Sequence, residues 1–376
     1  MKNRLNFRNI CLGGALLLGL SFAACSDDDN NAMPISLTGV TSLDKMDTPI
    51  VEAAMGDFIA IHGTGLDVHN IDSVLINDVA VDMLEVYTEN DILYLKIPVQ
   101  LPKNETNKIY IYNSTGCKEI EFRAKAPDLR LDRMFNEYTK PGDTIMIYGD
   151  YFNLYEIDSL NAEVDFNGKI SKIIKCGNNF LTAQVPVNVD KNIKVKVRGT
   201  KWDVEATCPG RYYDREFMIM DFDEFKPDDM KHVVTDEKDP QRLSGNFLRI
   251  DSKSEYSGWW YIAERGGIEY TADMLGEETC KNYVVKCEFR TANQFIKDKI
   301  KFCNYLYWAA PTCDWIATDF NVQNFDRWET ITLPFTVVKS DNYPGSYTSF
   351  NMRLEIDQDI ARNFAFDNIR ICRKGD

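Results

Sequence analysis

Two groups of side chains in this sequence suit chemistry on a carbohydrate: a cluster of aromatic rings and a short alternation of carboxylates. The segment 255–328 contains five of the six tryptophans of the chain, together with six tyrosines. Aromatic rings with a polar edge stack on ligands that have apolar faces and hydroxylated edges, as sugar rings do. The segment therefore indicates a surface that binds a polysaccharide.

Five aromatic residues of this segment are the predicted glycan-binding residues. Two of them are adjacent, so on an extended strand they face opposite sides of a sheet, and one of the two must enter the core. The sequence leaves open which one does so. The others lie in an adjacent pair and in a turn, where an aromatic ring has fewer packing roles. The predicted set is Trp259, Trp260, Tyr307, Trp308 and Trp315.

Polar residues near these rings are expected to hydrogen-bond the hydroxyl groups of a sugar. Glu264, Arg265 and Asn304 are the candidates. We expect two other tryptophans to pack inside the protein, because large aromatic side chains dominate cores. These are Trp328, in a predicted strand, and the isolated Trp202.

The carboxylates of Glu355, Asp357 and Asp359 alternate along the chain, so on a strand all three lie on one face. Glycoside hydrolysis uses carboxylates that flank the scissile bond. The stretch 355–359 resembles the Glu-Ile-Asp core of jelly-roll β-glucanases, although those enzymes have Glu at the last acidic position. A charged strand face in solvent explains the same pattern. Hydrolysis is therefore an alternative, and we expect a protein that is not an enzyme.

The first residues have the pattern of an export signal. Cations precede an apolar run over residues 10–22, which is too short and too soon followed by acidic residues to span a membrane. The sequence Phe22-Ala23-Ala24-Cys25 then resembles a bacterial lipobox, with Phe in place of the usual Leu.

The lipobox resemblance implies that Cys25 is acylated and anchors the chain in a membrane. The acidic stretch 26–31 resembles the export signal of Bacteroidetes lipoproteins that are displayed on the outer face of the outer membrane. An ordinary signal peptide with a solvated acidic tether is the alternative. We therefore expect a signal peptide over 1–24, a tether over 25–34 and an outer-membrane, cell-surface location.

The charge of the chain limits its partners. The formal net charge is −15, and loss of the cationic signal would make it more negative. Such a chain has no basic surface for nucleic acid. It also repels anionic polysaccharides, so we expect a neutral glycan.

The cysteines allow disulfides without requiring them. An exported protein can form disulfides, and Cys280–Cys287 or Cys303–Cys313 are candidate local pairs. Cysteine is also a common small buried residue, so the pairing stays open.

We expect no cofactor. The three histidines are scattered and no CxxC or Cys/His ligand spacing occurs, which argues against zinc. A structural Ca²⁺ is an alternative, because this cation takes carboxylate ligands. It would use Asp221, Asp223 or Glu224 near the start of the C-terminal domain and Asp367 near its end.

Two repeats precede the aromatic segment. The stretch 56–63, Gly-Asp-Phe-Ile-Ala-Ile-His-Gly, returns 86 residues later over 142–149 as Gly-Asp-Thr-Ile-Met-Ile-Tyr-Gly. A hairpin pattern and a strand ending in proline follow each copy. Regular spacing indicates duplicated domains, and short alternating strands fit immunoglobulin-sized β-sandwiches.

The repeat pattern resembles the IPT/TIG family of Ig-like domains, and we place the copies at 35–125 and 126–208. Asp57 and Asp143 are expected to form turns by accepting backbone N–H groups. We interpret the pair of domains as a spacer without chemistry of its own.

The remaining residues, 209–376, are expected to form a larger β-sandwich of jelly-roll type with one short helix near 292–297. The stretches 220–223, 327–334 and 364–371 resemble the first, middle and last strands of carbohydrate-binding jelly rolls. The predicted fold is therefore all-β, with two tandem Ig-like sandwiches followed by a jelly roll.

The order of these parts resembles the surface glycan-binding lipoproteins of Bacteroidetes polysaccharide-utilisation loci, in particular the type with a xyloglucan-binding terminal domain. In that family an earlier tryptophan and a later Tyr-Trp pair form the binding platform, and Tyr307-Trp308 matches the pair. The resemblance implies capture of xyloglucan or another β-glucan for a neighbouring outer-membrane importer and for glycoside hydrolases of the same locus. An adhesin or structural lipoprotein that binds protein partners is the second interpretation.

Overall fold

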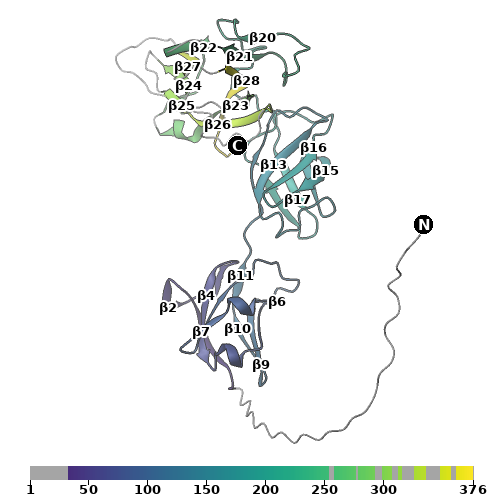
Figure 1. The fold of residues 1–376 in the computed structure, drawn as a ribbon, viewed down its shortest axis with the longest axis vertical. Helices are drawn as coiled ribbons and strands as arrows, with labels where there is room; N and C mark the ends of the chain where they lie inside the picture. Colours follow the sequence, from purple (N-terminus) through teal and green to yellow (C-terminus); the bar gives the residue numbers. More distant parts are fainter. Residues whose placement is uncertain are drawn as a thin grey trace, which may run out of the picture. The chain divides into compact units, whose positions relative to one another are not determined.

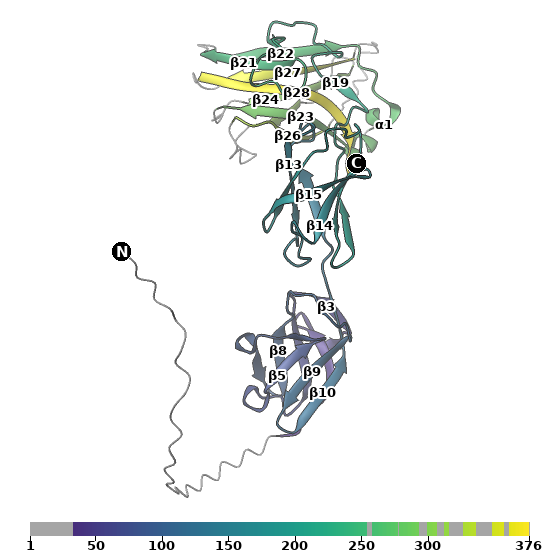
Figure 2. The same ribbon diagram turned by 90° about the vertical axis from the view of Figure 1, so that its right-hand side faces the viewer.

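The structure is a computed structural model that describes residues 33–253, 258–276, 278–292, 299–306, 312–315, 326–335, 348–356 and 361–375. It is almost entirely β, as the sequence predicts (Figures 1 and 2). The chain divides into two compact units, one with residues up to 98 and 104–124, the other with 99–103 and 125–376. Within the described residues, no helix has the length and apolar character to cross a bilayer.

The first unit is a β-sandwich whose sheets have the strand orders β2-β1-β4-β8-β7 and β10-β9-β5-β6, with β11 and β3 paired beside them. Its core is aliphatic, with Ile59, Leu93 and Ile109 fully buried. Alternation places these residues on inner faces, so the predicted period-two pattern is confirmed. The elements are β1 Ser36–Ser42, β2 Lys45–Pro49, β3 Glu52–Ala54, β4 Phe58–Thr64, η1 Val68–Asn70, β5 Ser73–Ile76, β6 Val79–Ala80, η2 Met83–Glu85, β7 Tyr87–Glu89, β8 Ile92–Lys96, β9 Lys108–Asn113, β10 Gly116–Glu121 and β11 Arg123–Lys125.

The second repeat, strands β12–β18, forms one seven-stranded path in the order β12-β13-β16-β15-β14-β17-β18 around its own core. Ile147, Val164 and Leu181 are fully buried there. Trp202 packs against this core, as expected. The strands are β12 Arg130–Met134, β13 Thr144–Asp150, β14 Ala162–Phe166, β15 Lys169–Cys176, β16 Phe180–Gln184, β17 Val195–Gly199 and β18 Val204–Thr207.

The two repeats share backbone details at equivalent positions. Gly56 and Gly142 both have positive φ, 91° and 90°, a conformation that favours glycine. Their N–H groups donate to the carbonyls of Ile97 (2.9 Å) and Val185 (2.8 Å), just before the predicted prolines. The same turn thus begins the same strand in both copies. The assignment of the repeats to the IPT/TIG family stays a prediction.

The rest of the second unit is a sandwich of two sheets, which we call the C-terminal sandwich. One sheet has the order β20-β21-β28-β23-β26, with β19 also paired to β28, and the other has the order β22-β27-β24-β25. One core, with Phe289, Met352 and Phe366 almost fully buried, fills the space between them. The predicted middle and last strands lie in the first of these sheets, as β26 and β28. Of the predicted first strand, 220–223, only Met220 is in a strand, at the end of β19, so that prediction was largely wrong.

The elements of this sandwich are mostly strands. The predicted helix near 292–297 lies largely outside the described residues, and the predicted domain boundaries stay predictions. The elements are β19 Met218–Met220, β20 Val233–Val234, β21 Phe247–Lys253, β22 Gly258–Gly266, α1 Ala272–Leu275, η3 Thr279–Asn282, β23 Tyr283–Thr291, β24 Lys299–Leu306, β25 Thr312–Trp315, β26 Glu329–Pro334, β27 Thr348–Ile356 and β28 Ala361–Arg373.

Candidate functional site

Three of the predicted glycan-binding residues lie in the four-stranded sheet of the C-terminal sandwich. Trp259 and Trp260 are in β22, and Trp315 ends β25. The backbone of these residues is described, and their side chains are not. Tyr307 and Trp308 lie outside the described residues.

The strand register places the adjacent residues Trp259 and Trp260 in different rows of the sheet. Trp260 pairs with Leu354, which pairs with Ile300, which pairs with Trp315, so these residues form one row across the sheet. Leu354 is fully buried in the core. The row therefore belongs to the core face, because directly paired residues share a face.

Trp259 belongs to the next row, with Glu355 and Lys299. Neighbouring rows alternate between the two faces of a sheet. This row therefore belongs to the face that points away from the core, and the register supplies the choice that the sequence leaves open.

That second face of the sheet is polar. Along β27, Phe350, Met352 and Leu354 enter the core, while Ser349, Asn351 and Arg353 lie on the other face. We call the face marked by these three polar residues the polar face. Ser349 and Asn351 are at most 1% exposed, although they point away from the core. The Ser349 hydroxyl has no hydrogen-bond partner in the described part of the chain.

The polar face has hydrogen-bond donors and acceptors, but Ser349 and Asn351 are buried, and Arg353 alone of the three is partly exposed. Arg353 donates from Nε to the amide oxygen of Asn351 (3.1 Å), which fixes both side chains. The guanidinium of Arg353, held by Asn351, is therefore the group of this set that can donate to a sugar hydroxyl. Ser349, Asn351 and Arg353 are not among the residues predicted from the sequence, although residues 349–354 alternate between polar and apolar side chains.

The three predicted polar candidates differ in position. Glu264 pairs with Asn351, on the polar face. Arg265 instead donates from Nη1 to the carbonyl of Ile219 (2.6 Å) and lies 4.8 Å from the centre of the Phe225 ring. Its guanidinium therefore holds two parts of the sandwich together.

The backbone positions of Asn304 and of the predicted carboxylate set give less support for a role in binding or catalysis. Asn304 pairs with Phe350, in a row of the core face, and its side chain is not described. Of the predicted carboxylate set, Glu355 lies in β27, and Asp357 and Asp359 are outside the described residues.

The acidic residues of the calcium alternative have protein partners. Asp221 Oδ1 accepts the N–H groups of Asp223, Glu224 and Phe225 at 2.8–3.1 Å, and Oδ2 lies 2.7 Å from Arg215. Burial opposes the charged form, but these donors outweigh it and lower the pKa of Asp221.

Asp367 behaves differently, since burial and the nearby Glu288 raise the pKa of this carboxyl well above its usual value. In the described ranges there is no group of three His, Cys, Asp or Glu side chains placed to hold a metal ion. The calcium alternative thus finds no ligand set there.

One predicted disulfide is absent, the other is not tested, and the predicted packing role of Trp328 is confirmed. Cys287 carries a free, fully buried thiol, so the Cys280–Cys287 bridge is not formed, and burial raises the pKa of that thiol. In the register of β24 and β25, Cys303 lies opposite Thr312 and not opposite Cys313. The side chains of both cysteines are not described, so the Cys303–Cys313 bridge stays a prediction. Trp328 packs edge-to-face on Phe247 (5.8 Å), as expected for a packing residue.

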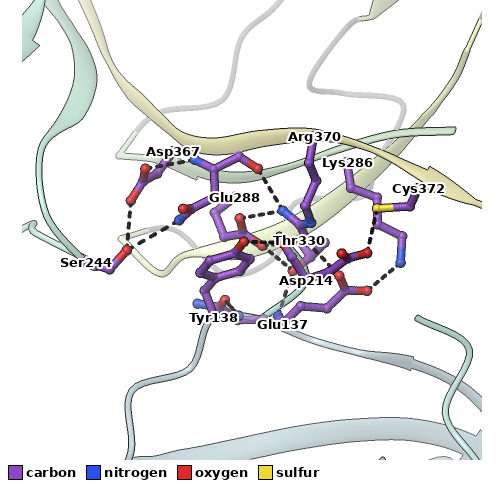
Figure 3. A network of polar contacts seen from close by, with 12 residues as sticks. Glu137, Tyr138, Asp214, Ser244, Lys286, Glu288, Thr330, Asp367, Arg370 and Cys372 are labelled. Atoms are coloured by element: carbon purple, nitrogen blue, oxygen red, sulfur yellow. Dashed lines mark hydrogen bonds and ion pairs between the residues drawn. The ribbon is translucent and has the colours of Figure 1, made fainter. Parts of the chain in front are cut away.

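A buried group of charged residues holds the C-terminal sandwich to the second repeat (Figure 3). At its centre Arg370, from β28, is fully buried. Its guanidinium lies 2.9 Å from Glu288 Oε2 and 2.6 Å from Glu137 Oε2, and it covers the Tyr138 ring at 4.8 Å. Glu137 and Tyr138 come from the loop between β12 and β13. We call Glu137, Lys286, Glu288, Thr330 and Arg370 the junction network.

The other members add further contacts, although Arg370 Nε is buried without a hydrogen-bond partner among the described residues. Lys286 Nζ lies 2.5 Å from Glu137 Oε1. The Thr330 hydroxyl donates to Glu288 (2.9 Å) and accepts the backbone N–H of Glu137 (2.8 Å). Each charge therefore has a partner of opposite sign, which buried charges require.

The junction network connects the second repeat to β23 and β28. Burial raises the pKa of Glu288 to about 7, against the opposing effect of Arg370. The two strands pack through their inner residues against the sheet that carries the polar face. The network thus supports the sandwich from the side opposite that face.

Comparisons with known proteins agree with this architecture. Residues 212–373 match the family model described as the surface glycan-binding protein B xyloglucan binding domain. The structure is similar to the crystal structure of surface glycan-binding protein PbSGBP-B from Prevotella bryantii, with 17% identity, coverage of 91% of this chain and 99% of that one, and a TM-score of 0.55.

A second similar structure is SGBP-B from a complex xyloglucan utilization locus in Bacteroides uniformis, with 14% identity, coverage of 91% and 100%, and a TM-score of 0.47. No curated protein matches the sequence. The resemblance to surface glycan-binding proteins expected from the sequence is confirmed, and at these identities the structural likeness concerns the fold.

Proposed function

We propose that the chain is a non-catalytic glycan-binding protein of the cell surface that holds a neutral polysaccharide, xyloglucan or another β-glucan, on its C-terminal sandwich. The match of residues 212–373 to a xyloglucan-binding domain carries this proposal. The polar face supports it, because Arg353 is partly exposed there and its guanidinium can donate to a hydroxylated ligand.

The aromatic residues supply the stacking energy. Trp259 lies in a row of the polar face, and the resemblance adds Tyr307 and Trp308. A ring that removes about 60 Å² of apolar surface from water contributes about 1.5 kcal/mol at about 25 cal/mol per Å². A few such contacts, less the cost of association, correspond to micromolar to millimolar dissociation constants. Many anchored copies on one cell surface would raise the avidity.

The location and partners follow from the N-terminal pattern and the similar proteins. Acylated Cys25 would anchor the chain in the outer membrane, facing outward. The bound polysaccharide would pass to a neighbouring importer and to glycoside hydrolases of the same locus. These partners rest on the resemblance stated for the sequence.

Calorimetric titration of residues 34–376 with xyloglucan, mixed-linkage β-glucan and an anionic polysaccharide tests the proposal. We expect binding to at least one neutral β-glucan. Trp259→Ala should weaken it about tenfold or more with little change in melting temperature, because one stacking contact is lost. Trp260→Ala should instead destabilise the sandwich by about 3–5 kcal/mol, as expected for a large residue on the core face.

Other outcomes would overturn the proposal in identifiable ways. Release of reducing ends that disappears in Glu355→Gln would indicate a hydrolase. No binding to any glycan, with retained binding to a protein partner, would favour the adhesin alternative. Equal loss of stability in both tryptophan variants would contradict the assignment of the two rows.

A further inference from the structure

A cavity of about 290 Å³ lies where the second repeat meets the C-terminal sandwich. Its lining includes Phe135 and Lys140 from the second repeat and Arg242, Arg290 and Trp328 from the sandwich. None of the residues that mark the polar face belongs to it. Its volume is at the lower end of the range for small-molecule sites, which corresponds to a ligand of about one sugar ring.

The cavity is cationic although the chain is strongly acidic. Four cations line it, Lys140, Arg242, Arg290 and Arg327, against two carboxylates, Asp143 and Asp326. At physiological ionic strength the distant acidic residues are screened beyond about 8 Å. The local excess of positive charge therefore decides which ligands are favoured inside the cavity.

Two guanidinium groups in this lining have unused donors. Arg290 is 8% exposed, and its Nη2 lies 2.7 Å from Asp326, but its Nη1 has no hydrogen-bond partner among the described residues. The Nη1 of Arg242 is likewise buried and without a partner there. A buried donor without an acceptor costs about 1–3 kcal/mol, so an anion that reaches either Nη1 through a small shift of the arginine side chain would recover that cost.

Burial also holds the pKa of Arg290 below its usual value, and the neighbouring Arg249 acts in the same direction. An additional anion would offset both effects. Lys140 is already fixed beside the site, since its Nζ donates to the carbonyl of Arg242 (2.9 Å).

Aromatic rings form the apolar part of the lining. Trp328 is held in place because its Nε1 donates to the carbonyl of Gln241 (2.7 Å) and its ring packs on Phe247. Arg327 lies over the ring of Phe135 at 4.8 Å. Phe135 is almost fully buried, so the cavity combines planar cationic donors with one partly exposed aromatic ring, that of Trp328.

We propose that this cavity is a second ligand site, which binds a carboxylate-bearing sugar residue such as a uronic acid. Guanidinium groups match the planar geometry of a carboxylate and can each donate two parallel hydrogen bonds to it. The ring of Trp328 suits the apolar face of the sugar ring. A polymer with uronic acid side groups could place such a residue here, and so could a free acidic sugar.

Titration of residues 34–376 with sodium glucuronate and sodium galacturonate tests this site. Methyl glucoside serves as the neutral control, and acetate and sulfate serve as anions without a sugar ring. We expect one of the two uronates to bind about tenfold or more tightly than acetate and sulfate, and the glucoside not to bind. A glucuronate-substituted polysaccharide, compared with its carboxyl-reduced form, tests whether the polymer reaches the cavity.

Arg242→Gln should weaken uronate binding about tenfold or more while leaving neutral β-glucan binding unchanged. Arg290→Lys keeps the charge but loses the planar donors, so it should weaken uronate binding too. Because Arg290 is buried and its variant can fail to fold, Lys140→Gln, at an exposed position, is a further test with the same expected direction. Arg130→Gln, an exposed arginine of the second repeat outside the cavity, is the matched control and should change nothing.

The proposal fails if neither uronate binds, or if sulfate binds as tightly as the uronates, which would indicate a simple anion site. It also fails if Arg242→Gln and Arg130→Gln behave alike. If the wild-type chain binds no neutral β-glucan, the proposed function is overturned, but the proposal of a uronate site is not affected. The two proposals can therefore fail independently.

Discussion

The two repeats share one backbone framework, but they differ in the residues that precede the glycine turn. Residues 135–139 of the second repeat are all buried, whereas none of the equivalent residues 49–53 of the first repeat is buried. Glu137 is 3% exposed, and Val51, at the equivalent position 86 residues earlier, is 70% exposed. The same edge of the same fold is therefore largely exposed to solvent in one copy, where it includes the end of β2 and the start of β3, and is a docking segment in the other.

This difference shows what turns a spacer domain into a supporting one. The docking segment buries the rings of Phe135 and Tyr138 and also contributes Glu137 to a group of buried charges. Buried ion pairs seldom add net stability, because desolvation offsets their attraction, but breaking one is costly. We infer that the junction network specifies how the second repeat and the C-terminal sandwich fit together.

Glu137→Ala should have the largest effect, because it leaves Arg370 and Lys286 buried with fewer partners. We expect a loss of about 3–5 kcal/mol in the free energy of unfolding of the second unit. Val51→Ala, at the equivalent exposed position, should change stability by less than about 0.5 kcal/mol. Urea unfolding followed by tryptophan fluorescence is suitable, since all six tryptophans lie in residues 202–328, within that unit. A loss below about 1 kcal/mol for Glu137→Ala would contradict a structural role for the network.

Gly210→Ala should have the next largest effect. Gly210 has a φ of 88°, and a Cβ there would lie 2.5 Å from Glu137 Oε1 and 2.6 Å from Lys286 Nζ. Gly168 has nearly the same φ, 89°, but no atom lies within 4 Å of its Cβ position. Both variants should lose about 1 kcal/mol through backbone strain. Gly210→Ala should lose roughly 1–2 kcal/mol more, because it forces the ion pair apart.

The fluorescence midpoints of the two glycine variants measure this difference directly. Equal losses would mean that the ion pair moves aside without cost. In that case the docking segment would be less rigid than the contacts of Glu137 imply.

The sequence predicts the repeats well because their signals are local. A glycine with positive φ, the carboxylate after it and a strand that alternates at period two lie within eight residues of each other. The hydrogen bonds of Gly56 and Gly142 follow from that pattern. The aromatic segment is also visible, because its composition alone suggests stacking.

The junction network and the sides of the tryptophans are not local. Glu137 lies 149 residues before Lys286 and 233 before Arg370. From the sequence alone, each of these three residues looks like an ordinary charged residue on a strand face or in a loop. The choice between Trp259 and Trp260 depends on the register with β27, which shifts between Tyr261 and Ala263. No pattern within β22 determines that register.

The junction network should also make the stability of the second unit depend on pH. The first repeat has Val51 at the position equivalent to Glu137, so it has no titratable group there. Burial raises the pKa of Glu288 to about 7 from 4.5. The folded state therefore binds more protons than the unfolded state between these pH values, and stability falls as the pH rises through that window. The limiting slope for one proton is about 1.4 kcal/mol per pH unit.

Glu288→Gln isolates this contribution. We expect the wild-type second unit to lose stability between pH 5 and pH 7.5, and the variant to lose less over the same range. Unfolding midpoints in urea at four or five pH values give the two slopes. Parallel slopes would show that another buried carboxyl, such as Asp367, accounts for the whole dependence.

The smallest predicted effect lies in the turn that the two repeats share. Asp57 Oδ2 accepts the N–H of Ala54 (3.1 Å), whereas the carboxylate of the equivalent Asp143 has no hydrogen bond to a described residue. Asp57→Ala should therefore destabilise the turn of the first repeat by about 0.5–1 kcal/mol, and Asp143→Ala should have a smaller effect on its own turn. Hydrogen exchange at the amides of Ala54 and Lys140 reports each turn separately within the whole chain. If Asp143→Ala accelerates exchange at least as much as Asp57→Ala does, the turns are equivalent, and the contrast between the copies is confined to the docking segment.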